Sequence, residues 1–217
     1  MTDVPDWWRG QVPPGRPPDG LSPRELVTGS VSAVGSSGLI LSTPLRRLHF
    51  YRATVVGVDL WLTDVHLAVE WSEFHDCRFR QRVRPVLDPD GCAAQGSFGN
   101  SPALYRGCTF ERVRFKTLGG FSLGNARFEA CTFVDCRWEG HFADATDLVD
   151  NRFVGRMNGC AWVGRSRSDN RYRHGRRNVI HGNDFTQTRF TDNVGWRQDF
   201  PLEAQRWPAG FAPLVDD

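Results

Sequence analysis

The side chains in this 217-residue chain that are best suited to metal chemistry are two cysteines and a histidine. Cys131, Cys136 and His141 stand five residues apart, and thiolates and imidazole are common zinc ligands. The familiar zinc ligand pair is CxxC, however, whereas this spacing is CxxxxC. Because cysteine also serves as a compact core residue, we expect these side chains to fill the interior. We predict no metal and no cofactor.

A second candidate is the arginine-rich run GRSRSDNRYRHGRR at residues 164–177. Arginines bind phosphates and aromatic rings stack on bases, so the run could contact nucleic acid. A solvated loop and a contact with an acidic protein surface are the alternatives. The candidate binding residues are its basic and aromatic side chains: Arg165, Arg167, Arg171, Tyr172, Arg173, His174, Arg176 and Arg177.

Groups for catalysis are not arranged in a recognisable pattern. The acids are scattered singly, as at Glu129, Asp135 and Glu139, and the chain has neither GxxxxGK[ST] nor HExxH. Only Cys92 lies in an expected loop, where a thiol could be reactive, and no histidine partner is assignable to it. We therefore expect that the protein is not an enzyme.

The elements that carry these residues follow a period of five. Between residues 123 and 153 a large apolar residue recurs at every fifth position with few exceptions, and the residue two before it is small or compact. A step of five rotates a residue by about 140° around a helix, and it alternates faces along a flat strand, so neither element fits. The pattern fits a chain that turns a corner every five residues, so that four sides make a square coil of twenty. The predicted core anchors are Phe110, Phe115, Leu123, Phe128, Phe133, Trp138, Leu148, Phe153, Phe185 and Phe190.

Stacked coils of this kind pair their backbones with the coils above and below. With CTF at 108–110, ARF at 126–128, CTF at 131–133, CRW at 136–138 and TRF at 188–190, the chain resembles the pentapeptide repeat family. Cysteine often replaces the alanine of the family motif, and arginine or threonine often fills the middle slot. The resemblance implies an all-β fold, a right-handed quadrilateral parallel β-helix. The stretches that depart from the period predict short helical caps and two loop excursions.

The expected organisation has three parts. Residues 1–37 form a proline-rich mobile N-terminus and cap, with a helix starting at Ser22 in SPREL. Residues 38–196 form the β-helix, interrupted by loops at 80–104 and 163–177, and its regular run breaks near residue 155. Residues 197–217 form a C-terminal cap with a short helix that begins at Pro201.

Composition and resemblance together leave three functions open. A net charge of +2, no long apolar run and no visible export signal predict a cytoplasmic protein without a membrane segment. We expect a macromolecule-binding module whose partner is a protein. The resemblance implies a second possibility, protection of DNA gyrase by a DNA mimic, with homodimerisation through the C-terminal end. Nucleic-acid binding by residues 164–177 is the third.

Overall fold

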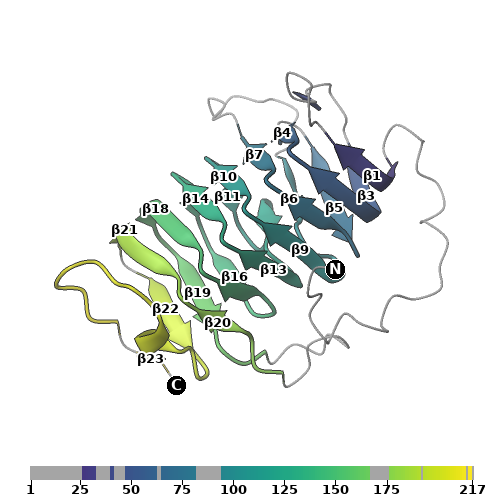
Figure 1. The fold of residues 1–217 in the computed structure, drawn as a ribbon. Coiled ribbons are helices and arrows are strands. Elements are labelled where there is room, and N and C mark those ends of the chain that lie inside the picture. The colour runs from purple at the N-terminus through teal and green to yellow at the C-terminus, as the bar shows by residue number, and fades with distance from the viewer. Residues whose placement is uncertain are drawn as a thin grey trace.

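The structure, a computed structural model, describes residues 26–32, 40–41, 47–62, 65–81, 94–166, 176–191, 193–213 and 215–216. In these residues the strands pair in parallel throughout, and the one helix is the short 3-10 helix η1, Leu202–Ala204. Figure 1 shows the strands lying side by side as successive rungs, from β1 (Leu26–Ser32) and β3 (Arg47–Val56) to β22 (Val194–Arg197). The predicted all-β, parallel β-helix is confirmed. No helix in the described ranges has the length and apolar character needed to cross a membrane.

A single coil between residues 126 and 149 shows why the sequence repeats every five positions. Its four sides and the return strand are β13 (Ala126–Glu129), β14 (Thr132–Val134), β15 (Arg137–Trp138), β16 (His141–Ala143) and β17 (Asp147–Val149). Ala130, Asp135 and Gly140 occupy its corners with φ of 51°, 49° and 56°. This left-handed conformation turns the chain after each short side. Phe128 then pairs with Leu148, one coil later.

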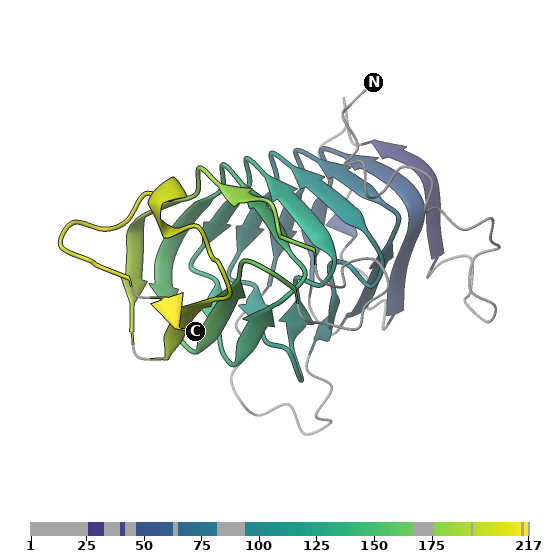
Figure 2. The same cartoon turned by 90° about the horizontal axis from the view of Figure 1, so that it is seen from below.

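The coil has four faces, which we number in chain order. Figure 2 shows the same strands from below, after a 90° turn. The first face contains β5 (His66–Glu70), β8 (Gln95–Ser97), β12 (Phe121–Ser122), β16, β19 (Cys160–Val163), β22 (Val194–Arg197) and β23 (Val215–Asp216). The second contains β6 (Glu73–His75), β9 (Ala103–Arg106), β13, β17 and β20 (Ile180–His181). The third contains β2 (Ile40–Leu41), β4 (Asp59–Trp61), β7 (Arg78–Arg80), β10 (Thr109–Glu111), β14, β18 (Arg152–Met157) and β21 (Asp184–Phe190). The fourth contains β11 (Arg114–Phe115) and β15, and the ends of β18 and β21 beyond the Gly155–Thr188 pair adjoin it.

The inside of the coil is filled with stacked aromatic rings. On the third face the rings of Phe110, Phe133 and Phe153 lie 4.8 Å apart from one neighbour to the next, within 11° of parallel. Phe185 and Trp207 continue the column at 4.5 and 5.0 Å. The ring spacing therefore matches the distance of about 4.8 Å between neighbouring strands. All the predicted anchors are buried except Phe190, which is partly buried against the same core.

The number of residues in a coil differs from the twenty that the sequence predicts. Phe133 pairs with Phe153 at that spacing, but Leu60 pairs with Phe79 after nineteen residues and Phe110 with Phe133 after twenty-three. A corner can contain fewer or more residues, because only the inward anchors must stay in register with those of the next coil. The predicted break near residue 155 is confirmed by a register shift between β18 and β21 next to Gly155, which has φ of 111°.

Part of the first predicted loop excursion is strand. Residues 82–93 lie outside the described residues, but β7 includes residue 80, and β8 and β9 include residues 95–97 and 103–104. Phe98 is fully buried and its ring packs against those of Phe79 and Phe110. The glycine-rich sequence predicts a loop there, and this prediction is wrong for residues 95–97 and 103–104, because the buried anchor Phe98 returns the chain to the coil.

The two ends also differ from the helical caps that the sequence predicts. Residues 22–25 lie outside the described residues, and Leu26 begins strand β1 (Leu26–Ser32), which pairs with β3 (Arg47–Val56). At the other end the helix stops after Ala204, because Gln205 is extended and its side chain enters the buried core. β1 thus precedes the predicted β-helix start at 38, and β23 follows its predicted end at 196.

We expect Phe133→Ala to lower the free energy of unfolding by about 3–5 kcal/mol, because it leaves a cavity between two stacked rings. Thr132→Ala in the same strand is the control, since Thr132 is partly exposed and lies outside the ring column. Urea unfolding of both variants and the wild-type protein measures the difference. Equal losses for the two variants would contradict the role assigned to the ring column.

Candidate functional site: an arginine column on the fourth face

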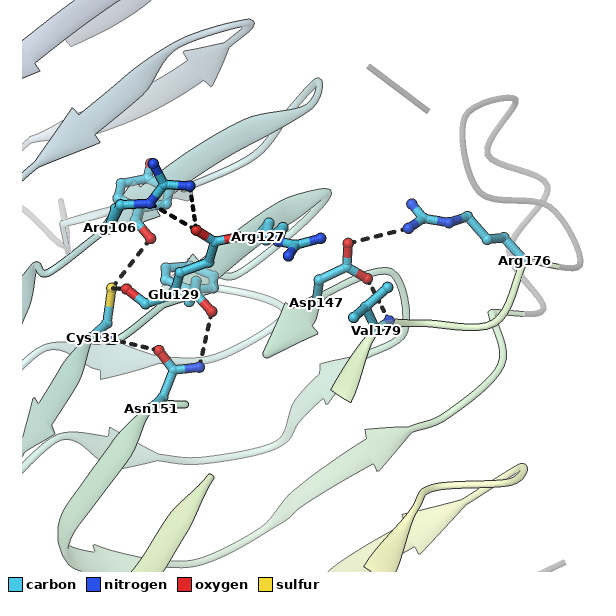
Figure 3. A network of polar contacts seen from close by, with 10 residues as sticks. Arg106, Arg127, Glu129, Cys131, Asp147, Asn151, Arg176 and Val179 are labelled. Carbon is cyan, nitrogen blue, oxygen red and sulfur yellow. Dashed lines mark hydrogen bonds and ion pairs between the residues drawn. The ribbon is translucent and has the colours of Figure 1, made fainter. Parts of the chain in front are cut away.

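Three of the predicted arginine-loop residues are described, and each faces a carboxylate. Arg165 and Arg177 both reach Asp199, with N–O distances of 3.3 and 3.4 Å. Arg176 lies 3.4 Å from the buried carboxylate of Asp147, which also accepts the Val179 N–H, as Figure 3 shows. Arg167, Arg171, Tyr172, Arg173 and His174 lie outside the described residues. The described base of this loop is therefore held by ion pairs, so part of its positive charge is already neutralised.

Charged side chains on the second and third faces are also paired across rungs. Glu129 accepts from Arg106 on the preceding coil at 2.6–2.8 Å and from Arg127 beside it (Figure 3). On the third face Arg78 lies 3.2 Å from Glu111, and Arg80 pairs with Asp59. Such pairs contribute little stability when exposed, but they neutralise part of the charge of these two faces.

The cysteines that could have formed a metal site are core residues. Cys131, Cys136 and His141 are each at most 4% exposed. The described part of the chain contains no group of three or more His, Cys, Asp or Glu side chains that could hold a metal. Burial raises the pKa of the Cys136 thiol to about 12, so this thiol stays protonated. Cys92, the thiol expected in a loop, lies outside the described residues.

One corner of the coil changes from thiol to amide side chains along the rod. Cys77, Cys108 and Cys131 occupy it in successive coils, and their thiols donate to backbone carbonyls at 3.3–3.5 Å. Asn151 and Asn183 follow them: Asn151 Oδ1 accepts the Cys131 N–H, and Asn183 Oδ1 accepts the Asn151 N–H. These side chains satisfy buried backbone groups, which is a structural role.

The fourth face carries a column of arginines that the sequence did not reveal. Arg114 is in register with Arg137, and Arg156 is in register with Arg189 on the adjoining part of β18 and β21. Arg114 pairs with Glu139 at 2.9 Å. Arg137, Arg156 and Arg189 are exposed and have no carboxylate partner among the described residues. This set, which we call the arginine column, leaves three guanidinium groups available to a partner.

A notch interrupts the column between Arg137 and Arg156. β15 is the last strand of its sheet, because the next coil passes this corner without a strand paired to it. The resulting hollow of about 350 Å³ has Trp138 and Cys136 in its lining. The polar side chains that line it are Asp135, Arg137, Glu139, Arg156 and Asn158.

Two exposed apolar side chains lie at the corner next to this notch. Leu118 is 80% and Phe142 43% exposed, and they are the large hydrophobic side chains that the described residues leave most open to solvent. The chain segments that carry them are neighbours, because the Phe142 N–H donates to Thr117 Oγ1 at 2.9 Å. The Thr117 N–H donates to the Gly140 carbonyl at 3.4 Å, and Gly140 follows the notch residue Glu139, so both segments lie at the corner that ends the fourth face.

Sequence reasoning missed this surface because its members are irregularly spaced. Arg114, Arg137, Arg156 and Arg189 are separated by twenty-three, nineteen and thirty-three residues. No short motif marks them, whereas the arginines of residues 164–177 are contiguous and conspicuous. The available signal was the outward slot just before an anchor, as at Arg114 before Phe115 and Arg137 before Trp138.

Comparisons with known proteins add one distant structural similarity. No family model matches the chain, and no curated protein matches it. The chain is similar to the solved structure of QnrB1, a plasmid-mediated fluoroquinolone resistance protein, at 10% sequence identity and a TM-score of 0.27. The match covers 88% of this chain and 92% of QnrB1. A TM-score this low says nothing about the function of this chain.

We expect acid to destabilise the protein partly through His141, whose ring contacts Phe115 and Trp138 beneath the fourth face. Burial lowers the pKa of His141 from 6.5 to about 3. Below pH 6.5 the unfolded histidine binds a proton while the folded one stays neutral, so stability falls as the pH falls through this window. Between pH 7 and pH 5, the free energy of unfolding of the His141→Phe variant should therefore fall by about 2 kcal/mol less than that of the wild-type protein.

Urea unfolding at both pH values measures this difference. His75→Phe is the control, since His75 is a partly exposed histidine that lies 3.1 Å from Glu73. If the His141→Phe protein shows the same acid dependence as the wild-type protein, the histidine does not remain neutral in the folded state.

Proposed function

We propose that this protein is a non-enzymatic binding module that recognises a protein partner through the arginine column together with Leu118 and Phe142. The observation that carries the proposal is that arginines with no carboxylate partner among the described residues lie on the same part of the surface as exposed apolar side chains. Arginine and aromatic residues are enriched at protein interfaces and at their energetic centres. Both kinds of side chain are present here.

The core supports a role in surface recognition. The rings of the third and fourth faces stack in contact along the coil, and such packing leaves little room for a ligand inside. Outward side chains are then the groups available for recognition. A rigid β-helix holds them in place before a partner arrives, which lowers the entropic cost of binding.

A nucleic-acid partner is less well supported. Trp138, the aromatic ring in the lining of the notch, is only 4% exposed, so a base cannot stack on it, and among the described residues of this surface only Phe142 presents an exposed ring. The described arginines of residues 165–177 already face Asp147 and Asp199. Phosphate binding there would have to break or outcompete these ion pairs.

Protection of gyrase by DNA mimicry is the other alternative implied by the sequence. A mimic needs a dense negative surface, whereas the second and third faces have paired charges and the fourth has unpaired arginines. We therefore expect no restoration of supercoiling when excess protein is added to drug-inhibited gyrase. Restored supercoiling would favour that function over a basic contact surface.

The proposal predicts a partner whose binding depends on the apolar pair. We expect Leu118→Ser combined with Phe142→Ser to weaken partner binding by about tenfold or more, as for side chains at the centre of an interface. Thr186→Ala on the exposed third face is the control and should leave binding unchanged. Immobilised wild-type and variant proteins, incubated with nuclease-treated host lysate, would be compared by quantitative mass spectrometry.

Two results would contradict the proposal. One is a set of retained proteins that does not differ between the wild-type and the double variant. The other is retention that disappears on nuclease treatment, because that would identify nucleic acid as the bound component.

A further inference from the structure

We infer that the notch between Arg137 and Arg156 receives a carboxylate side chain, so that the partner presents a protein segment in which acidic and apolar residues adjoin. This inference rests on the proposed function and specifies the chemistry of the partner. It starts from the fact that Arg137 and Arg156 come from different coils and line the same hollow. No carboxylate among the described residues pairs with either of them.

The walls of the notch suit a carboxylate. Arginine presents planar N–H donors that match the two oxygens of a carboxylate, and the fork geometry adds specificity to the charge. Asn158 adds an amide to the same lining. Trp138 gives the hollow an apolar element that lowers the exposure of a bound ion pair to water.

The acidic side chains at the notch favour binding of one carboxylate over binding of a nucleic-acid backbone. Asp135 and Glu139 also line the hollow, and Glu139 is held by Arg114 at 2.9 Å. The lining therefore contains two arginines and two acids. A carboxylate can lie between Arg137 and Arg156, whereas a continuous phosphodiester backbone would also pass these two acids and be repelled by them.

The neighbouring surface specifies the rest of the segment. Leu118 and Phe142 lie around the corner from the notch and would contact an apolar residue close to the acidic one. Arg189 continues the column beyond Arg156 and offers a place for a second carboxylate. Acidic residues interleaved with apolar ones are therefore the pattern that fits both parts of the surface.

The test uses a fluorescent peptide of alternating glutamate and leucine, and a matched peptide in which glutamine replaces glutamate. We expect the full-length protein to bind the glutamate peptide more tightly, as measured by fluorescence anisotropy. Arg137→Gln combined with Arg156→Gln should weaken this binding by about tenfold or more. Arg197→Gln is the charge control, because Arg197 is exposed on the first face and has no ion pair in the described ranges.

The structural control is the thermal unfolding temperature, which should be the same for the notch variant and the wild-type protein because both arginines are exposed. Preferential loss of glutamate-peptide binding in the notch variant supports the inference. Equal weakening by Arg197→Gln overturns it, since the binding would then report only net charge. Tighter binding of a single-stranded oligonucleotide that displaces the peptide overturns it in favour of a nucleic-acid partner.

The remaining outcomes separate this inference from the proposed function. If peptide binding depends on Leu118 and Phe142 but not on the notch, the notch assignment is wrong and the binding module stands. The same holds if no peptide binds while a host protein is still retained through the apolar pair. Failure of both peptide binding and host-protein retention overturns both proposals.

Discussion

The stacking of inward aromatic rings at the strand spacing is the interaction on which the rest of this structure depends. Phe110, Phe133 and Phe153 lie in one column with 4.8 Å between neighbouring rings, and the same spacing lets each strand hydrogen-bond to the next. Core packing and backbone pairing thus impose a single register. A strand whose anchor ring is in the column therefore stays paired with its neighbours, whatever the length of the segment between two anchors.

This constraint leaves the corners and outward positions open to variation. Loops enter between rungs without disturbing the core, as the coil of twenty-three residues between Phe110 and Phe133 illustrates. At one corner the inward side chain changes from Cys131 to Asn151, because either a thiol or an amide can satisfy nearby backbone groups. Outward positions tolerate a wider range of side chains, so each face can have its own pattern of surface charge.

The distribution of charge separates the four faces. On the second and third faces, arginines of one coil pair with acids of another, as Arg106 does with Glu129. On the fourth face three arginines have no such partner in the part of the chain that the structure describes, and the absence of a strand paired to β15 in the next coil opens the notch between two of them. A surface that combines unpaired charge, a hollow and exposed apolar side chains is suited to recognition, and the filled core holds it rigid.

The sequence by itself determined the repeating coil and its inward anchors, because the period of five reflects local backbone turns and side-chain size. It could not determine how many residues lie between rungs, since a loop of any length can leave and rejoin the same corner. That number decides which distant residues share a face. Only the tertiary structure therefore brought Arg137 and Arg156 together, returned Phe98 to the core and placed acids against Arg165 and Arg177.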